Sequence, residues 1–450
     1  MTHTPLPTGT PPHGALHPAA VNKTELRRAG WAGFIGTVLE NYDMVVYGVG
    51  TAIIFNTLFF PNVSPAVGFI ASFGAYAVGF IARPMGGLFF SRYGDKIGRK
   101  FVLVATLALM GTATFAMGLL PTYESVGILA PILLTVLRFI QGFGAGAEMA
   151  SAVVLLAEFA PKGRRGAMTS LVWAGAAVGS VFGSGAWILV QLLPREDLES
   201  WGWRLVFLSS ALVTVAAYLI RRNMKESPVF AELKKEHVEA ASPVSEVLKK
   251  GRRPLRQVFL INMGTHAHSY IYQAFLGTFL ISVVNIDKAL IPQMLAMGGL
   301  FAIPAALIAG RATDRWGRKP VNVFILAFLF LFSFPAFWLS STGNVWLIAL
   351  VYAVGFTFAV EGGIAAQSAM YAELFGSKYR YAGVAIAREF SAIFGGGIAP
   401  IICSGLLAWA TGSYWPIAVY MMVIVGISLF QAIKAPETKD RDLTLEENAS

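Results

Sequence analysis

Acidic side chains occur at helical spacing inside an apolar stretch near the start of the chain. In the stretch 31–59, Glu40, Asp43 and Tyr47 follow one another at intervals of three and four residues, which places them on one face of a helix. A carboxyl group held partly away from water there is suited to bind and release a proton. We therefore predict a proton-coupling role for Glu40 and, as a second candidate, for Asp43. The alternative is that Asp43 forms a structural ion pair with Arg83.

A second polar face lies in the stretch 127–159, where Arg138, Gln141 and Glu148 share one side of a helix. The planar guanidinium of arginine matches a carboxylate through two parallel hydrogen bonds and stays charged. We therefore predict that Arg138 and Gln141, together with Tyr47, bind an anionic substrate. Glu148 is a further proton-coupling candidate. The alternative is that backbone carbonyls satisfy Arg138 inside a glycine-packed helix.

The second half of the chain offers comparable polar positions. Arg388 is a second candidate to hold an anionic group, and the alternative is that Glu361 or Glu389 merely neutralises it. His266 titrates near neutral pH when solvated, whereas a hydrogen-bonded histidine in the core is the alternative. The candidates for lining a substrate cavity in this half are His266, Tyr270, Gln273, Glu361 and Arg388.

These residues belong to a chain that is too apolar for a water-soluble globule. Of its 450 residues, 56% are hydrophobic and 13% charged, and the mean hydropathy is +0.62. Continuous apolar runs of about 20 residues indicate membrane-spanning helices rather than barrel strands. The predicted fold class is an all-α membrane protein of about 12 helices. We place them near 31–59, 66–92, 101–120, 127–159, 167–193, 202–220, 255–285, 289–312, 320–340, 344–374, 381–410 and 413–433.

A long polar stretch divides the chain into two halves of six helices. Basic residues concentrate in alternate loops, so the tails and the central loop are expected in the cytoplasm and the helices in the cell membrane. The net charge of +10 is then expected to face lipid headgroups rather than nucleic acid. The predicted parts are a disordered tail over 1–22, a bundle over 23–221, a central loop over 222–254, a second bundle over 255–434 and a tail over 435–450.

No cofactor and no metal are expected. His266 and His268 are two residues apart, so they point to opposite sides of a helix and cannot chelate one ion together. The nucleotide-binding pattern GxxxxGK[ST] is missing from the sequence, which argues against an ATP-driven pump. We expect a protein that works as a monomer.

Two landmarks of the first half recur in the second. GDKIGRK at 94–100 recurs as TDRWGRK at 313–319, and AEFAPKGRR at 157–165 recurs as AELFGSKYR at 372–380. A duplication of this kind predicts two pseudo-symmetric bundles with a cavity between them, and rocking of the bundles exposes that cavity to alternate sides.

These repeated motifs, together with LRFIQGFGAGAE at 137–148, resemble the signatures of the major facilitator superfamily. Its metabolite:proton symporters, which carry shikimate, α-ketoglutarate, citrate and proline or betaine, are similar at LENYDMVVYG (39–48), FIARPMGG (80–87), WGWRLVF (201–207), KESPVF (225–230) and GGGIAP (395–400). FNTLFFPNVSPAVG at 55–68 and ELFGSKYRYAG at 373–383 resemble the shikimate carriers. The pairs Glu40-Asn41 and Arg388-Glu389 depart from that branch, which leaves the substrate open.

The resemblance implies a gate at the cytoplasmic end. The acids of the repeated loops, Asp95 and Asp314, are each expected to approach a helix N-terminus in the other half, the eleventh helix and the fifth helix respectively. Pairing of Arg99 with Glu158, and of Arg318 with Glu373, resembles the relay that joins these ends. The predicted gate residues are Asp95, Arg99, Glu158, Arg165, Asp314, Arg318, Glu373 and Arg380.

The function implied is proton-coupled import of a small organic acid across the bilayer by alternating access. An exporter or antiporter of the same fold is one alternative. A non-transporting nutrient sensor is another, although such sensors usually carry a long signalling domain. We do not expect an enzyme, because no nucleophile, base and orienting acid cluster within one segment.

Overall fold

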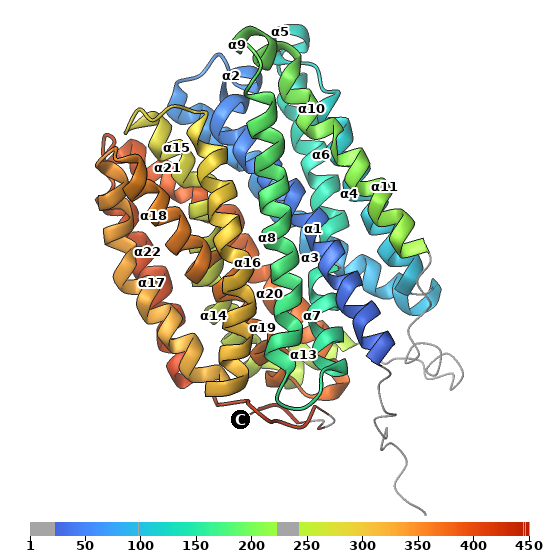
Figure 1. Ribbon diagram of the computed structural model, residues 1–450. Helices are drawn as coiled ribbons and strands as arrows, with labels where there is room; N and C mark the ends of the chain where they lie inside the picture. Colours follow the sequence, from blue (N-terminus) through green and yellow to red (C-terminus); the bar gives the residue numbers. More distant parts are fainter. Residues whose placement is uncertain are drawn as a thin grey trace, which may run out of the picture.

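Long helices run side by side through the whole molecule (Figure 1). The structure is a computed structural model that describes residues 23–97, 99–146, 148–222, 243–443, 445 and 447–449. Every regular element in these ranges is helical.

The first half forms six helical rods. They are α1 (Lys23–Gly50) continued by η1 (Thr51–Phe55) and α2 (Asn56–Phe59); α3 (Pro65–Ile97); α4 (Arg99–Gly118); α6 (Leu129–Ala145) with α7 (Glu148–Phe159); α8 (Arg165–Val190); and α10 (Trp203–Leu208) with α11 (Ser210–Arg222). The short helices α5 (Tyr123–Val126), α9 (Arg195–Asp197) and η2 (Leu198–Gly202) connect them at one end.

The second half repeats the pattern. After α13 (Pro243–Lys250) come α14 (Arg252–Tyr270) with η3 (Ile271–Phe275) and α15 (Leu276–Ser282); α16 (Leu290–Trp316); α17 (Arg318–Ser341); α18 (Val345–Gly355) with η4 (Phe356–Val360) and α19 (Glu361–Leu374); η5 (Ser377–Tyr379) and α20 (Arg380–Ala392) with η6 (Ile393–Ile398) and α21 (Ala399–Trp409); and α22 (Trp415–Lys434).

Most of these rods are long and apolar enough to cross a bilayer. Within the described ranges, nine helices meet that requirement by length and composition, and Val104–Gly118 is a shorter apolar helix. The rods α10–α11 and α14–α15 complete the twelve. The predicted spans are therefore present, although α1 begins at Lys23 rather than near residue 31, and α3 extends to Ile97.

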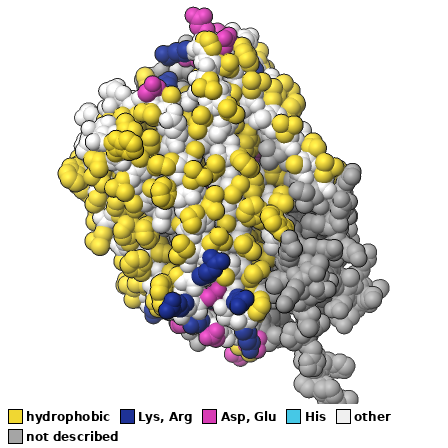
Figure 2. Space-filling model, in the orientation of Figure 1, with side chains coloured by type: hydrophobic (Ala, Val, Ile, Leu, Met, Phe, Trp, Pro, Cys, Tyr) yellow, Lys and Arg dark blue, Asp and Glu magenta, His cyan; other side chains and the backbone are white. Residues whose placement is uncertain are grey.

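The outer surface is apolar, and its charges gather at the ends. Figure 2 shows hydrophobic side chains covering the middle of the visible face, with Lys, Arg, Asp and Glu near its two ends. Tryptophans lie at helix ends, and Trp346 is 83% and Trp409 70% exposed. Exposed aromatic rings at that level are typical of a membrane interface. The surface is thus suited to lipid rather than to water.

One end of the bundle carries basic residues from both halves. We call it the basic end; it contains the start of α8, the end of α16 and the start of α17, with Arg164, Arg165, Arg315, Arg318 and Lys319. The first described helix starts and the chain ends at this end (Figure 1). Here the structure differs from the predicted parts in two places. The predicted central loop contains the helix α13, and residues of the predicted tail 435–450 lie against the basic end. The predicted disordered tail 1–22 lies outside the described residues.

The halves meet along several helices. α8 packs against α1 of its own half and against α16 of the other half, and α20 contacts α3 and α7 (Figure 1). A stripe of glycines on α8, formed by Gly175, Gly179 and Gly183, makes the first of these contacts possible. A Cβ atom on Gly175 would lie 2.3 Å from the backbone oxygen of Phe34, and one on Gly179 equally close to that of Val38. Close backbone approach of this kind requires glycine.

The stripe yields a test with a control on the same helix. Gly175→Ala should destabilise the protein by about 1–3 kcal/mol, because the added methyl group forces α1 and α8 apart. Gly185→Ala should be neutral or slightly stabilising, because nothing lies within 4 Å of its added Cβ and alanine favours helix. Thermal unfolding of the purified variants measures both. Equal melting temperatures for the two would contradict this account of the packing.

Candidate functional site

Charged side chains inside the spans face inward rather than toward lipid. Glu40, Arg83, Glu361 and Arg388 are at most 4% exposed. All four line one enclosed cavity between the two halves. The space open to the centre of a water molecule is about 20 Å³, enough for roughly one water. The lining residues are Glu40, Asn41, Met44, Arg83, Met149, Trp173, Ala176, His266, Ser269, Tyr270, Gln273, Val360, Glu361, Ile364, Arg388 and Ala392.

Arg83 joins the halves inside this cavity. Its Nη2 lies 2.5 Å from Oε1 of Glu40 on α1, and its Nε lies 2.7 Å from Oε2 of Glu389 on α20. The sequence interpretation that paired Asp43 with Arg83 is wrong for this structure, since Asp43 accepts a hydrogen bond from Thr114 at 2.8 Å instead. Arg83 is thus the ion-pair partner of Glu40. The coupling role predicted for Glu40 stays a prediction.

Glu361 is held by neutral groups of the other half. Its Oε1 accepts hydrogen bonds from Ser180 at 3.2 Å and from Asn41 at 3.4 Å. Asn41 also donates to the backbone oxygen of Ala176 at 2.6 Å, so its amide is fixed between α8 and α19. The other oxygen of Glu361, Oε2, is buried without a hydrogen-bond partner.

Arg388 is buried and only partly satisfied. Its guanidinium lies over the ring of Trp173, 5.2 Å from the ring centroid. Its Nε and Nη1 have no hydrogen-bond partner, although a buried cation normally requires one. Neither Glu361 nor Glu389 pairs with it among the described contacts, because Glu389 binds Arg83. The structure thus leaves two donors of Arg388 free beside the cavity.

The predicted face of the seventh rod lines the same cavity. His266, Tyr270 and Gln273 all contribute to the wall, with Ser269 between them. The ring of Tyr270 packs edge-on against Phe80 of α3, with centroids 4.9 Å apart. Contact between rings of the two halves narrows the cavity on this side.

Arg138 occupies a different environment from the one predicted. Its guanidinium lies between the rings of Tyr47 and Tyr76, 4.4 and 4.7 Å from their centroids, and donates to Gln141. Gln141 in turn donates to Thr114 at 2.6 Å, the residue bound to Asp43. None of these residues lines the cavity. The cluster stabilises the core of the first half, and substrate binding by Tyr47, Arg138 and Gln141 stays a prediction.

Glu148, the remaining proton-coupling candidate, lies outside the cavity wall, whereas two residues that the sequence does not single out line it. Glu148 is 3% exposed at the start of α7 and does not line the cavity, although Met149 does. Asn41 and Trp173 line it but were not predicted as site residues. Trp173 also donates to Ser368 across the two halves at 2.6 Å. Both are uncharged, so the rule that charges inside spans are functional could not select them.

Among the described residues, no three His, Cys, Asp or Glu side chains converge as metal ligands.

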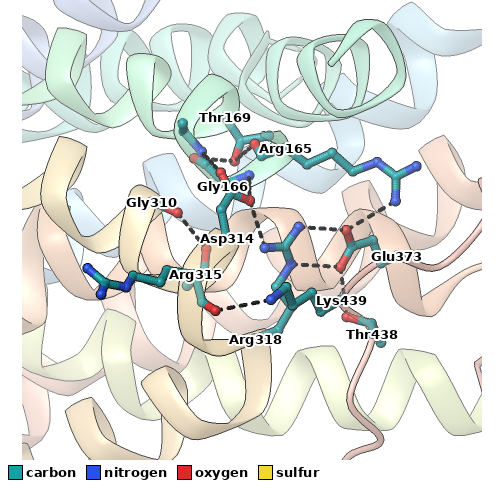
Figure 3. A network of polar contacts seen from close by, with 12 residues as sticks. Arg165, Gly166, Thr169, Gly310, Asp314, Arg315, Arg318, Glu373, Thr438 and Lys439 are labelled. Carbon is teal, nitrogen blue, oxygen red and sulfur yellow. Dashed lines mark hydrogen bonds and ion pairs between the residues drawn. The ribbon is translucent and has the colours of Figure 1, made fainter. Parts of the chain in front are cut away.

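A polar network joins the two halves at the basic end (Figure 3). The carboxylate of Asp314, at the end of α16, accepts hydrogen bonds from the backbone N–H groups of Gly166 and Ala167, both at 2.8 Å. These are unpaired donors at the N-terminus of α8, where a negative charge is stabilising. This is the contact with the fifth helix that the sequence predicts. Its role as a gate stays a prediction.

Glu373 is the centre of the same network. Arg318 donates to both of its oxygens at 3.0 Å, and Arg165 of the other half donates to Oε1 at 3.3 Å. The carboxylate of Glu373 is fully buried and Arg318 is 1% exposed. Figure 3 shows these side chains converging from α8, α17 and α19.

The repeated motifs pair crosswise between the halves. Arg165 of the first repeat contacts Glu373 of the second, and Arg380 of the second contacts Glu158 of the first at 3.0 Å. Glu158 therefore pairs with Arg380 here. The side chains of Asp95 and Arg99, which were predicted for the gate, lie outside the described residues.

The end of the chain covers this network. Backbone oxygens of Arg441 and Leu443 accept hydrogen bonds from Arg165 and Arg380 at 2.5 and 2.6 Å. Glu437 accepts from four backbone N–H groups, those of Arg318, Lys319, Thr438 and Lys439. Partial burial alone would raise the pKa of Glu437, but these four hydrogen bonds outweigh it and hold the pKa below the ordinary value of 4.5.

Comparison with known proteins identifies the family. The family model described as Major Facilitator Superfamily matches residues 44–400. The chain belongs to the major facilitator superfamily. It is therefore a multi-pass membrane transporter rather than an enzyme.

Individual relatives agree with this assignment. A protein of Escherichia coli (strain K12) named putative transporter YdfJ is 35% identical over 413 residues, which cover 91% of this chain and 96% of that protein. The shikimate transporter of the same strain is 33% identical over 413 residues, with 90% and 94% covered. A crystal structure of a D-xylose-proton symporter matches with a TM-score of 0.72 at 18% identity, over 93% of this chain and 100% of that one. The predicted twelve-helix fold is confirmed.

Removing the charge of Glu373 should loosen the basic end of this transporter. Loss of one partner from a buried ion pair costs about 3–5 kcal/mol, so Glu373→Gln should favour opening at that end. The test uses a background in which Cys403→Ser removes the native thiol and Ile364→Cys adds one thiol to the cavity wall. An impermeant maleimide applied from the basic end should label the thiol at position 364 at least about tenfold faster with Glu373→Gln than without it. The matched control is Glu199→Gln, whose exposed pair with Arg195 should be dispensable. An unchanged labelling rate for Glu373→Gln would argue against the network as a closure.

The Glu437 contacts should be sensitive to acid. Because the pKa of Glu437 is lowered in the folded protein, its contribution is present above pH 4.5 and is lost as the pH falls through the lower folded value. Hydrogen exchange at Arg318 and Lys319 should therefore lose protection in strong acid. At neutral pH, Glu437→Gln should reduce that protection about fivefold, the effect of removing a helix cap worth about 1 kcal/mol.

The control for this measurement is Glu447→Gln, since Glu447 is exposed and lies in the same terminal segment. Its protection pattern at Arg318 and Lys319 should match the unchanged chain. Full protection in Glu437→Gln at neutral pH would show that the carboxylate does not hold the start of α17.

Proposed function

We propose that this transporter imports a small carboxylated metabolite together with a proton. The observation that carries the proposal is Arg388, a buried guanidinium beside the cavity with Nε and Nη1 unpartnered. An unpartnered N–H donor on a buried guanidinium is suited to a charge-assisted hydrogen bond with a carboxylate. The stacked ring of Trp173 holds the guanidinium in place, so little freedom is lost when the anion binds.

The relatives support the same class of substrate. One of them is named a shikimate transporter, and shikimate is a carboxylic acid that also bears hydroxyl groups. The remaining wall of the cavity provides hydrogen-bonding partners for such groups in Asn41, Ser269 and Gln273. We propose a hydroxylated or otherwise polar organic acid of this size class as the substrate.

The orientation follows from charge. Arg165, Arg315, Arg318 and Lys319 gather at the basic end, and the positive-inside bias places such an end in the cytoplasm. Both termini would then be cytoplasmic and the protein would lie in the cell membrane. In this proposal the network around Glu373 is the inner gate.

Uptake into proteoliposomes tests the proposal. Purified protein with an imposed inward proton gradient is given labelled shikimate, α-ketoglutarate or glycine betaine in separate assays. We expect accumulation of an organic acid above its external concentration, abolished by a protonophore. Accumulation only under an outward gradient would indicate an antiporter instead, and binding without any flux would indicate a sensor.

Arg388→Lys should weaken transport of the acid. Lysine keeps the positive charge but loses the planar pair of donors, and a hydrogen bond to a charged group is worth about 1.5–3 kcal/mol. We expect the apparent affinity for the transported acid to fall by about tenfold or more. The control is Arg195→Lys, an exposed arginine at the opposite end. Unchanged affinity in Arg388→Lys would remove Arg388 from the substrate site.

A further inference from the structure

Glu361 differs from every other buried carboxylate at the cavity in having no cation as a partner. Its hydrogen-bond partners in the described structure are the neutral side chains of Asn41 and Ser180, both bound to Oε1. Its second oxygen has no partner at all, and the residue is 1% exposed. An isolated ionised carboxylate is very unfavourable in such surroundings, whereas a neutral carboxylic acid is tolerated.

The other charges around the cavity do not change this comparison. Glu40 and Glu389 share the guanidinium of Arg83, so each has a cationic partner. Arg388 is the remaining cation of the wall, and no described ion pair or hydrogen bond joins it to Glu361. His266 and Tyr270 complete the titratable groups that face the cavity. Nδ1 of His266 donates to the backbone oxygen of Asn262 rather than to Glu361.

From this geometry we propose that Glu361, which lines the cavity, binds the transported proton on its unpartnered oxygen Oε2. The proposal rests on proton-coupled transport as proposed above and identifies the coupling group. The step forms one O–H bond when the proton arrives from the side of higher proton concentration, and the same bond breaks when the proton passes to water on the other side. No other bond changes.

The contacts of Glu361 depend on the arrangement of the two halves. Glu361 belongs to α19 in the second half, whereas Asn41 and Ser180 belong to α1 and α8 in the first half. Rocking the halves apart removes both hydrogen bonds and admits water, which stabilises the ionised form. Closure reverses this and favours the protonated form. The proton occupancy of Glu361 is thereby linked to the movement that exposes the cavity.

Binding of an anion would strengthen this link. A carboxylate held by Arg388 adds negative charge to the same small cavity, which favours a neutral Glu361. By linkage, protonation of Glu361 favours binding of the anion to the same extent. The O–H group on Oε2 can also donate a hydrogen bond to the substrate. Proton and acid would therefore bind together, as symport requires.

Local backbone structure fixes Glu361 in this position. It follows directly on the π-helical turn η4, a type of irregularity that is frequent at functional sites. The next residue, Gly362, allows the turn, because a Cβ atom there would lie 1.8 Å from the backbone oxygen of Thr357. The wide turn and the glycine orient the carboxyl group toward α1 and α8.

Glu361→Gln is the main test, because glutamine has the same shape and mimics the protonated acid. In proteoliposomes loaded with shikimate, we expect the Glu361→Gln variant to keep exchanging internal for external shikimate. Proton-driven accumulation of shikimate should be lost. Infrared difference spectra of the purified protein between acid and alkaline buffer should show the C=O band of a protonated carboxyl, and Glu361→Gln should lack it. Glu361→Asp keeps a titratable group and should restore coupling with a shifted pH profile.

The controls separate the possible outcomes. Glu124→Gln, at an exposed glutamate, should leave accumulation and the infrared band unchanged. Accumulation at the original level in Glu361→Gln, or a surviving band, overturns the inference while proton-coupled import still stands. Uncoupling by Glu40→Gln with intact coupling in Glu361→Gln would place the proton on Glu40 instead. If the unchanged protein carries none of the acids offered, the proposed function fails, and the infrared band still decides whether Glu361 binds a proton.

Discussion

The closed form of this transporter depends on two ion pairs that exchange partners between its halves. Arg165 contacts Glu373, and Arg380 contacts Glu158, so each half supplies one cation and one anion to the other. Glu373 is fully buried, and a buried charge is stable only when it is paired and hydrogen-bonded. Neither half can satisfy these groups alone to the same extent. The duplication in the sequence therefore has a physical purpose, because it places complementary charges at equivalent positions of both bundles.

Closure at the basic end determines the electrostatics of the cavity. Once water is excluded, the charges of the wall divide into two groups. Arg83 is paired with Glu40 and Glu389, and this set of three joins the halves. Arg388 and Glu361 have no ion-pair partner among the described contacts, and buried atoms of both, like Oε2 of Glu40, lack a hydrogen-bond partner. Under the proposed function, these two residues are the groups to which a solute anion and a proton bind.

The sequence predicts the membrane-spanning helices better than it predicts which side chains meet between them. Apolar runs identify the spans because a bilayer accepts little else, and the repeated acids identify the contact of Asp314 with α8. Helical spacing also places His266 on the cavity face, but it cannot tell which rod that face meets. For this reason the sequence predicts substrate binding for both Arg138 and Arg388. In the structure, however, the rings of two tyrosines of the first half surround Arg138. The sequence does not single out Trp173, because placing an uncharged aromatic side chain in a membrane span has no free-energy penalty that would indicate a function.

Under the proposed function, the ion pairs of the basic end also explain how the proposed gate can open. Replacing one partner, as in a substitution at Glu373, leaves the other charge buried and alone, which costs about 3–5 kcal/mol. Opening the bundles is different, because water then solvates both partners at once and replaces much of what the pair contributed. Hydrophobic contacts at the same place would not regain their energy in water. A network of charges is therefore sensitive to the loss of one member, whereas hydration can replace all of its pairs together. Alternating access, as proposed, needs this second property.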